Sequence, residues 1–165
     1  MALRLLLLLL IVSGGVLQST LVAARGVGGV TPDVPLILTV LIALRNGPES
    51  GCLAGFVAGL LQDATGGGLV GVQALTKGLA GFGMGLLVGR FWVTNPLVQV
   101  PGLVLLSVAE GLGRFLLLQM FHYPAAFGEL MLHVILPQAL YNGLIGTLCI
   151  LAEASFELVR RRTWR

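Results

Sequence analysis

Charged and turn-forming residues divide the sequence into apolar stretches, and each stretch predicts a helix. The first uncharged run extends from Leu5 to Ala24, which is long enough to cross a hydrocarbon core of about 30 Å at about 1.5 Å per residue. Arg4, followed by a leucine run and small residues at 22–24, also resembles a cleavable secretory signal. Because the run is long for the apolar core of a signal, we predict a first transmembrane helix from about Leu3 to Ala23.

Prolines, glycines and charges set the boundaries of the later helices. The second and third predicted helices, near 35–45 and 48–63, are short, because their uncharged stretches would rise roughly 17–20 Å against a hydrocarbon core of ~30 Å. We expect these two to form a short hairpin that longer helices shield, or around which the bilayer thins. The other three predicted helices cover about 70–89, 97–121 and 128–159.

Composition assigns these helices to a membrane. The chain has 165 residues, of which 56% are hydrophobic and 10% are charged, and its mean hydropathy is +0.97. A soluble domain carries about 25% charged residues, so lipid must cover much of this surface. We therefore predict an all-α fold, a polytopic membrane bundle of about six transmembrane helices, in a single domain over 1–165.

The basic residues choose an orientation for such a bundle. With both termini in the cytoplasm, the outer loops hold Arg25 alone, and the positive-inside rule favours that arrangement. The segment 156–165 then becomes a basic cytoplasmic tail beside anionic lipid. Nucleic acid is a poor alternative partner, because no basic face interleaved with aromatics exists elsewhere. The basic residues on the inner side are Arg4, Arg45, Arg90, Arg160, Arg161, Arg162 and Arg165.

Glycines recur at every fourth residue on two of the predicted helices. In lipid, small residues favour helix association because they permit close contact between backbones. One interpretation is that the third and fourth helices pack within this bundle, and the other is that one ridge faces the helix of a partner protein. The ridges are Gly51, Gly55 and Gly59 on the third helix, and Gly81, Gly85 and Gly89 on the fourth.

Polar residues inside the predicted spans gather at roughly one depth, toward the outer side. Glu110 and Arg114 are four residues apart and can pair on one helix face, and Asp63 and Lys77 can supply a second pair. Such a cluster would be neutral, as buried ions require. Intramembrane charges are candidate functional residues. The outer polar cluster consists of Asp63, Gln73, Lys77, Glu110, Arg114, Gln138 and Asn142.

Three interpretations of this cluster remain open. It is a structural network that fixes helix packing, a site for a small solute that enters from outside, or a contact with a polar group of a partner protein. Gln138 and Asn142 fit interhelical hydrogen bonding equally well.

The sequence contains no recognisable catalytic, cofactor or metal site. His122 and His133 are not spaced as a metal pair, and no GxSxG, P-loop or HExxH motif is present. The only cysteines, Cys52 and Cys149, lie in apolar runs and are interpreted as small buried hydrophobes. We therefore do not expect an enzyme.

Several segments carry a pattern that can be compared with known proteins. They are QST at 18–20, PDVP at 32–35, RNGP at 45–48, GCLAGFVAGLLQD at 51–63 and GLVGVQAL at 68–75, followed by the helix with Gly81 and Gly85. In their order and spacing these segments resemble the MreD family of rod shape-determining membrane proteins. The strong part of the resemblance covers 32–89.

That resemblance implies a function that composition does not reveal. It implies a non-enzymatic scaffold in the bacterial inner membrane, within the elongation machinery that synthesises peptidoglycan and maintains cell shape. The implied direct partner is MreC, which has one membrane helix. Indirect partners are the MreB cytoskeleton, the RodA glycosyltransferase and a class B penicillin-binding protein. The family supplies no catalytic residues and no cofactor.

At the level of the fold, the MreD family also resembles the S components of energy-coupling-factor vitamin transporters. Those are six-helix proteins with an outward-facing solute pocket. The alternative function is therefore a solute-binding transporter subunit that uses Asp63, Lys77, Glu110 and Arg114. Against it, the outer polar cluster offers no aromatic cage for a solute.

Overall fold

The computed structural model describes residues 13–16, 18, 30–66, 68–91, 96–122 and 126–163. Within those ranges every regular element is helical and none is a strand. Most of the predicted first helix falls outside the described residues, although 13–16 and 18 are helical. The elements are α2 (Val34–Asn46), α3 (Pro48–Gly66), α4 (Val72–Phe91), α5 (Pro96–Met120), α6 (Phe127–Leu130), the π-helical turn η2 (Met131–Ile135) and α7 (Leu136–Thr163).

α2 begins and ends where the sequence supplies a cap and a turn. The Leu36 amide donates to Asp33 Oδ1 at 3.0 Å, which satisfies one of the free amides of the first turn. Gly47 ends the helix with a φ of 86°, a left-handed conformation that glycine adopts without a steric penalty. α3 then starts at Pro48 and packs against α2. The two helices form the predicted hairpin, in which α2 is short, with 13 residues, and α3 is longer than predicted, with 19.

The last predicted helix, 128–159, differs from prediction because a π-helical turn interrupts it. The Leu136 amide donates to the Met131 carbonyl, five residues back. The cause lies one residue further on: Pro137 has no amide hydrogen, and its ring would clash with the His133 carbonyl in a regular α-helix. The wider turn removes this conflict. The helix then continues as α7 to Thr163.

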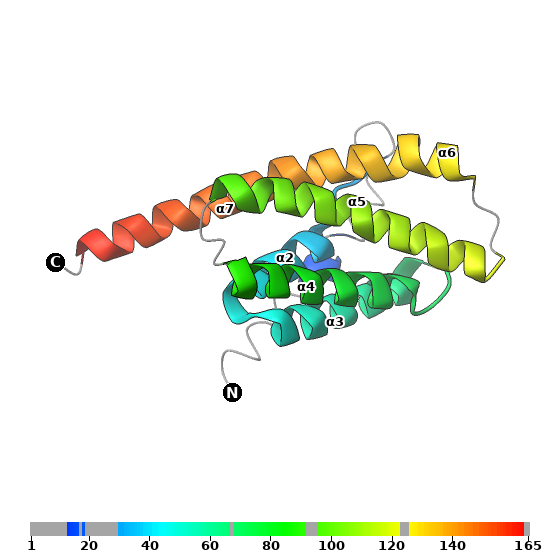
Figure 1. Ribbon diagram of the computed structural model, residues 1–165, viewed down its shortest axis with the longest axis horizontal. Helices are drawn as coiled ribbons and strands as arrows, with labels where there is room; N and C mark the ends of the chain where they lie inside the picture. The colour runs from blue at the N-terminus through cyan, green and yellow to red at the C-terminus, as the bar shows by residue number, and fades with distance from the viewer. Residues whose placement is uncertain are drawn as a thin grey trace.

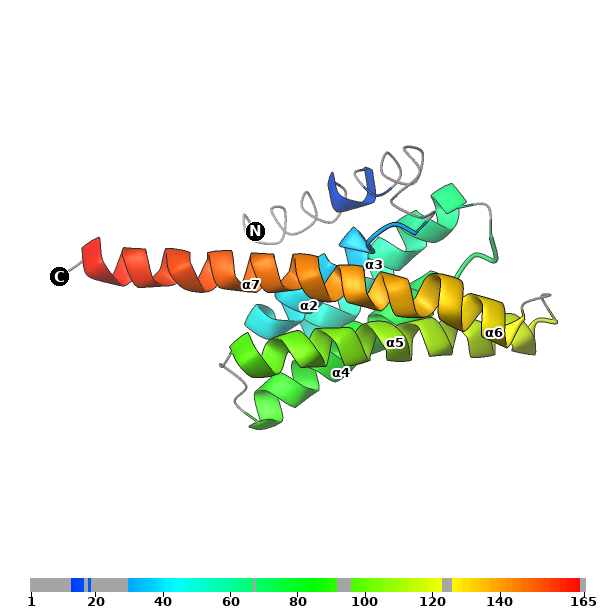
Figure 2. The same ribbon diagram turned by 90° about the horizontal axis from the view of Figure 1, so that it is seen from above.

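The helices form two layers (Figure 1). One layer consists of α5 and α7, which lie along each other. The other consists of α2, α3 and α4, with α2 and α4 facing the first layer and α3 on the side away from it. The C-terminal part of α7 extends beyond the rest of the bundle, as both views show (Figures 1 and 2). The C-terminal ends of α2, α4 and α7 all lie toward the same end of the molecule (Figure 1).

Along the glycine ridges, α3 and α4 form the most extensive contact between any two helices in the described part of the chain. A Cβ atom added to Gly55 would collide with the Lys77 carbonyl, and one added to Gly81 would collide with the Gly51 carbonyl. The same is true of Gly59 against the Gln73 carbonyl. Backbone therefore lies directly on backbone along this interface, as small residues permit.

The outward surface of the bundle is apolar. Two stretches, Val98–Met120 and Phe127–Ala152, are long and apolar enough to cross a membrane. Only 22% and 33% of an 18-residue apolar segment of each stretch is buried inside the structure, whereas the core helix of a soluble protein would be mostly covered. Large leucines follow the exposed face of the second stretch at helical spacing: Leu132, Leu136, Leu140, Leu144, Leu148 and Leu151.

Candidate functional site

Lys77 lies at the centre of a buried polar network on α4. Its side chain is completely buried, and its Nζ is 2.7 Å from Asp33 Oδ2 and 3.3 Å from Glu110 Oε1. The same ammonium donates to Gln73 Oε1 at 3.0 Å. The ammonium thus donates hydrogen bonds to Gln73 and Glu110 and forms a close ion pair with Asp33. Burial of the charge is therefore offset by two carboxylates and one amide oxygen.

Asp33 connects this ion pair to the two helices of the other layer. While its Oδ1 caps α2, its backbone amide donates to Asn142 Oδ1 on α7 at 2.7 Å. Asn142 Nδ2 in turn donates to Ser107 Oγ on α5 at 3.1 Å. Asp33 and Asn142 are both fully buried. A single chain of polar contacts thus joins α4, α2, α7 and α5.

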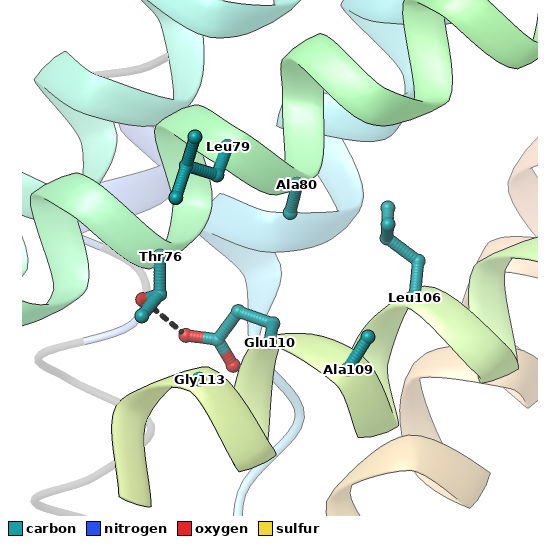
Figure 3. Close-up of a pocket in the computed structure, with 7 residues that line it drawn as sticks. All are labelled: Thr76, Leu79, Ala80, Leu106, Ala109, Glu110 and Gly113. Atoms are coloured by element: carbon teal, nitrogen blue, oxygen red, sulfur yellow. Dashed lines mark hydrogen bonds between the residues drawn. The ribbon is translucent and has the colours of Figure 1, made fainter. Parts of the chain in front are cut away.

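Glu110 provides the second carboxylate from α5. Thr76 Oγ1 donates to Glu110 Oε1 at 2.9 Å (Figure 3), and Lys77 Nζ donates to the same oxygen at 3.3 Å. Glu110 is 4% exposed. Arg114 lies one turn further along α5 and donates to Gln138 Oε1 on α7 at 3.3 Å. With Asp33 and Lys77, the four formal charges of the network sum to zero, which limits the penalty of burying them in lipid.

A second set of hydrogen bonds connects the segment before α2 to the network. Gln138 Nε2 donates to the Thr31 carbonyl at 3.4 Å. Gln18 Nε2 donates to Thr31 Oγ1 at 3.4 Å, and Gln18 Oε1 accepts the Val34 amide at 3.1 Å. These contacts hold the entry to α2 in the position from which Asp33 meets Lys77.

Asp63 has a different role from the one expected. Instead of pairing with Lys77, it accepts hydrogen bonds from the backbone amides of Gly71, Gln73 and Ala74 at 2.8, 3.2 and 3.2 Å. These amides belong to the start of α4, where free N–H groups and the helix dipole attract a carboxylate. The predicted pairing of Asp63 with Lys77 is therefore wrong.

The other predicted pairing also differs in the structure. Glu110 forms its ion pair with Lys77, and the Arg114 guanidinium hydrogen-bonds to Gln138. Of the predicted outer polar cluster, Gln73, Lys77, Glu110, Arg114, Gln138 and Asn142 all join the network through the contacts above. Among the predicted ridge residues, Gly85 lies against the backbone of Pro48, and the surroundings of Gly89 are not among those described.

Sequence reasoning missed five members of the network: Asp33, Thr76, Ser107, Gln18 and Thr31. Asp33 lies before the predicted start of the second helix near 35, so it falls outside the predicted spans in which intramembrane charges were sought. A signal was nevertheless available. A lysine in the middle of an apolar helix needs acidic partners, and Asp33 is one of only seven acidic residues in the chain.

A pocket of about 210 Å³ lies beside the network, between α4 and α5 (Figure 3). Its lining residues are Thr76, Leu79, Ala80, Leu106, Ala109, Glu110 and Gly113. No group of three or more His, Cys, Asp or Glu side chains that could hold a metal ion occurs in the part of the chain that the structure describes. Chemically, the site is suited to holding helices together and to offering one carboxylate to a neighbour.

An all-helical bundle with an apolar exterior and a neutral charge network inside it defines a class, the helical membrane proteins. The model of the rod shape-determining protein MreD family matches residues 1–159 of this chain. The chain belongs to the MreD family. Searches of curated proteins and of solved structures found no match.

Proposed function

We propose that this protein is a non-enzymatic scaffold in the machinery that determines rod shape and directs peptidoglycan synthesis. Membership in the MreD family carries the role in rod shape determination. The observation that supports a scaffold is that the buried polar side chains form hydrogen bonds and ion pairs with one another. The Lys77 ammonium contacts Asp33, Glu110 and Gln73. Among the described residues, no acid, base and nucleophile are arranged beside it as a catalytic site would require. Such a network fixes helices and leaves apolar faces for partners.

The proposed topology is a multi-pass bundle in the bacterial inner membrane with both termini in the cytoplasm. Its support is the common direction of the C-terminal ends of α2, α4 and α7 (Figure 1). Each of these ends carries arginine in the sequence: Arg45, Arg90 and the tail that includes Arg160. Basic residues at one end of an apolar bundle identify the cytoplasmic side, and 156–165 forms the basic tail beside anionic lipid.

The proposed direct partner is MreC, bound through its single membrane helix, with MreB, RodA and a class B penicillin-binding protein as indirect partners. The experiment that tests this is co-purification of the tagged protein with MreC in mild detergent, followed by mass determination of the complex. A stable complex of defined mass supports the scaffold. Failure to associate, with both proteins folded and monodisperse, contradicts it.

The alternative, a solute-binding subunit like the S component of a vitamin transporter, has weaker support. Lys77, Asp33 and Asn142 are fully buried and bonded to other protein groups, so a solute would have to displace these contacts. A thermal-shift screen with vitamin-like compounds distinguishes the two functions. Stabilisation that disappears in Glu110→Ala would favour the transporter subunit over the scaffold.

A further inference from the structure

The pocket between α4 and α5 has walls of small residues on both sides. Thr76 and Ala80 are four residues apart on α4, and Ala109 and Gly113 are four residues apart on α5. This spacing places each pair on one helix face. Pairs of small residues at this spacing are what allow a further transmembrane helix to approach closely.

One buried acceptor faces this pocket. Thr76 and Lys77 both donate to Oε1 of Glu110, while the other carboxylate oxygen points toward the Gly113 side of the pocket (Figure 3). The side chain of Glu110 is 2% exposed. With Arg114 included, the charges around Glu110 sum to zero, and an ionised carboxylate oxygen can only accept hydrogen bonds, so an uncharged hydrogen-bond donor suits this oxygen.

The depth of Glu110 restricts what that donor can be. Within the stretch Val98–Met120, Glu110 lies 12 residues from one end and 10 from the other (110 − 98 and 120 − 110). At about 1.5 Å per residue this is roughly 15–18 Å from either end, close to the middle of a bilayer. A lipid head group lies at the surface, and an acyl chain carries no donor. A transmembrane helix can supply a small-residue surface and a polar side chain at this depth.

The glycine ridges are not available to such a helix. Gly51, Gly55 and Gly59 already contact α4, and Gly81 and Gly85 already contact α3. In contrast, Leu79 at the edge of the pocket is 69% exposed, and Ala109 is exposed as well. Thr76 and Ala80 form the buried floor of the α4–α5 pocket, and Leu79 and Ala109 form the rim that the rest of the described bundle leaves uncovered.

We propose that the α4–α5 pocket is the docking groove for a single transmembrane helix of a partner protein. The helix packs a small residue against Ala109 and Gly113, and a Ser, Thr, Asn or Gln side chain beside it donates a hydrogen bond to Glu110. This inference rests on the proposed function, in which that helix belongs to MreC, and it assigns the surface that the helix uses.

The test compares Ala109→Leu, which fills the groove, with Ala152→Leu, which adds the same side chain to an exposed position on α7. Full-length tagged variants and wild type are co-expressed with MreC, and the amount of MreC retained per tagged protein is measured. We expect Ala109→Leu to retain at least about tenfold less MreC, equivalent to about 1.4 kcal/mol, and Ala152→Leu to retain the wild-type amount. Equal retention by both variants overturns the groove assignment.

A second measurement covers the case in which Ala109→Leu does not fold. A photo-crosslinking residue placed at Ala109, and in a separate protein at Ala152, is irradiated in native membranes. A crosslink to the MreC membrane helix from 109 and not from 152 supports the groove. A crosslink from 109 to phospholipid alone, or to a second copy of this chain, overturns it.

The retention experiment separates the groove from the proposed function. If wild type itself retains no MreC, the proposed function and the groove fail together, whereas retention by wild type and both variants removes the groove alone.

Discussion

α4 contacts its neighbours in two ways of opposite chemistry, through a glycine face toward α3 and a polar face toward α2 and α5, with Lys77, four residues before Gly81, at the border between the two faces. Toward α3 it presents Gly81 and Gly85, and the contact is made by backbone atoms with no side chains between them. Toward α2 and α5 it presents Lys77 and Thr76, and the contact is made by an ion pair and a hydrogen bond. In lipid, packing apolar side chains between helices gains little hydrophobic free energy, because the lipid tails are equally apolar. The two faces are the two remaining ways to hold helices together.

The faces differ in how they tolerate change. The glycine face depends on the absence of atoms, so any added carbon disturbs it. The polar face depends on the presence of charged partners, and each group left alone is a charge buried in a medium that solvates it poorly. We therefore expect loss of a charge on the polar face to have the largest effect, an added methyl on the glycine face the next, and loss of a neutral hydrogen bond the smallest.

The largest effect is predicted for Lys77→Met. This change keeps the length of the side chain and leaves Asp33 and Glu110 buried without their cation, for a loss of about 3–5 kcal/mol of folding free energy. The measurement is the apparent melting temperature in detergent, read by size-exclusion chromatography after heating. The matched control is the triple variant Lys77→Met with Asp33→Asn and Glu110→Gln, which removes the stranded charges and recovers part of the loss. If Lys77→Met alone were as stable as wild type, the ion pairs of Lys77 would not stabilise the bundle.

The next largest effect is predicted for Gly55→Ala on the other face. The new methyl would collide with the Lys77 carbonyl, and since both partners are backbone, α3 and α4 must separate. Overpacking of this kind costs about 1–3 kcal/mol. The control is Gly83→Ala on α4, where an added Cβ meets nothing within 4 Å and improved helix propensity gives up to about 1 kcal/mol in the opposite direction.

The same heat-and-chromatograph measurement applies to both glycine variants. If the apparent melting temperature of Gly55→Ala equalled that of Gly83→Ala and was no lower than that of wild type, the α3–α4 interface would have room that the structure does not show. It would also remove the contrast between the two faces of α4.

The two faces also differ in how well the sequence predicts them. The glycine ridges follow from spacing alone, because residues four apart share a helix face. The ends of α2 to α5 likewise lie within three residues of prediction, since local signals such as Asp33 and Gly47 set helix boundaries. The membership of the polar network was predicted in part: polar residues within the apolar spans are conspicuous in the sequence, whereas Asp33, the nearest partner of Lys77, lies just outside those spans.

The pairings within the network were not predictable in this way. Lys77 has Asp33, Asp63 and Glu110 as possible partners in the sequence, and charge counting treats all three as equivalent. The choice depends on the arrangement of the helices: α4 begins beside Asp63, whose carboxylate is used by the amides there, and the α2 cap brings Asp33 to the lysine. Sequence gives the need for a counter-charge, and tertiary structure decides which carboxylate supplies it.

The smallest effect is predicted for Ser107→Ala, which sharpens the comparison within the polar face itself. Ser107 Oγ accepts from Asn142 Nδ2 at 3.1 Å, at the far end of the chain of contacts from Lys77. Its loss removes one neutral interhelical hydrogen bond between α5 and α7, which averages about 0.6 kcal/mol in a membrane protein. The expected fall in apparent melting temperature is therefore several-fold smaller than that of Lys77→Met. Ser107→Thr, which keeps the hydroxyl, is the control for the lost oxygen. If Ser107→Ala destabilised the protein as much as Lys77→Met, the network would act as one cooperative unit, and the energy could not be assigned to the ion pair at its centre.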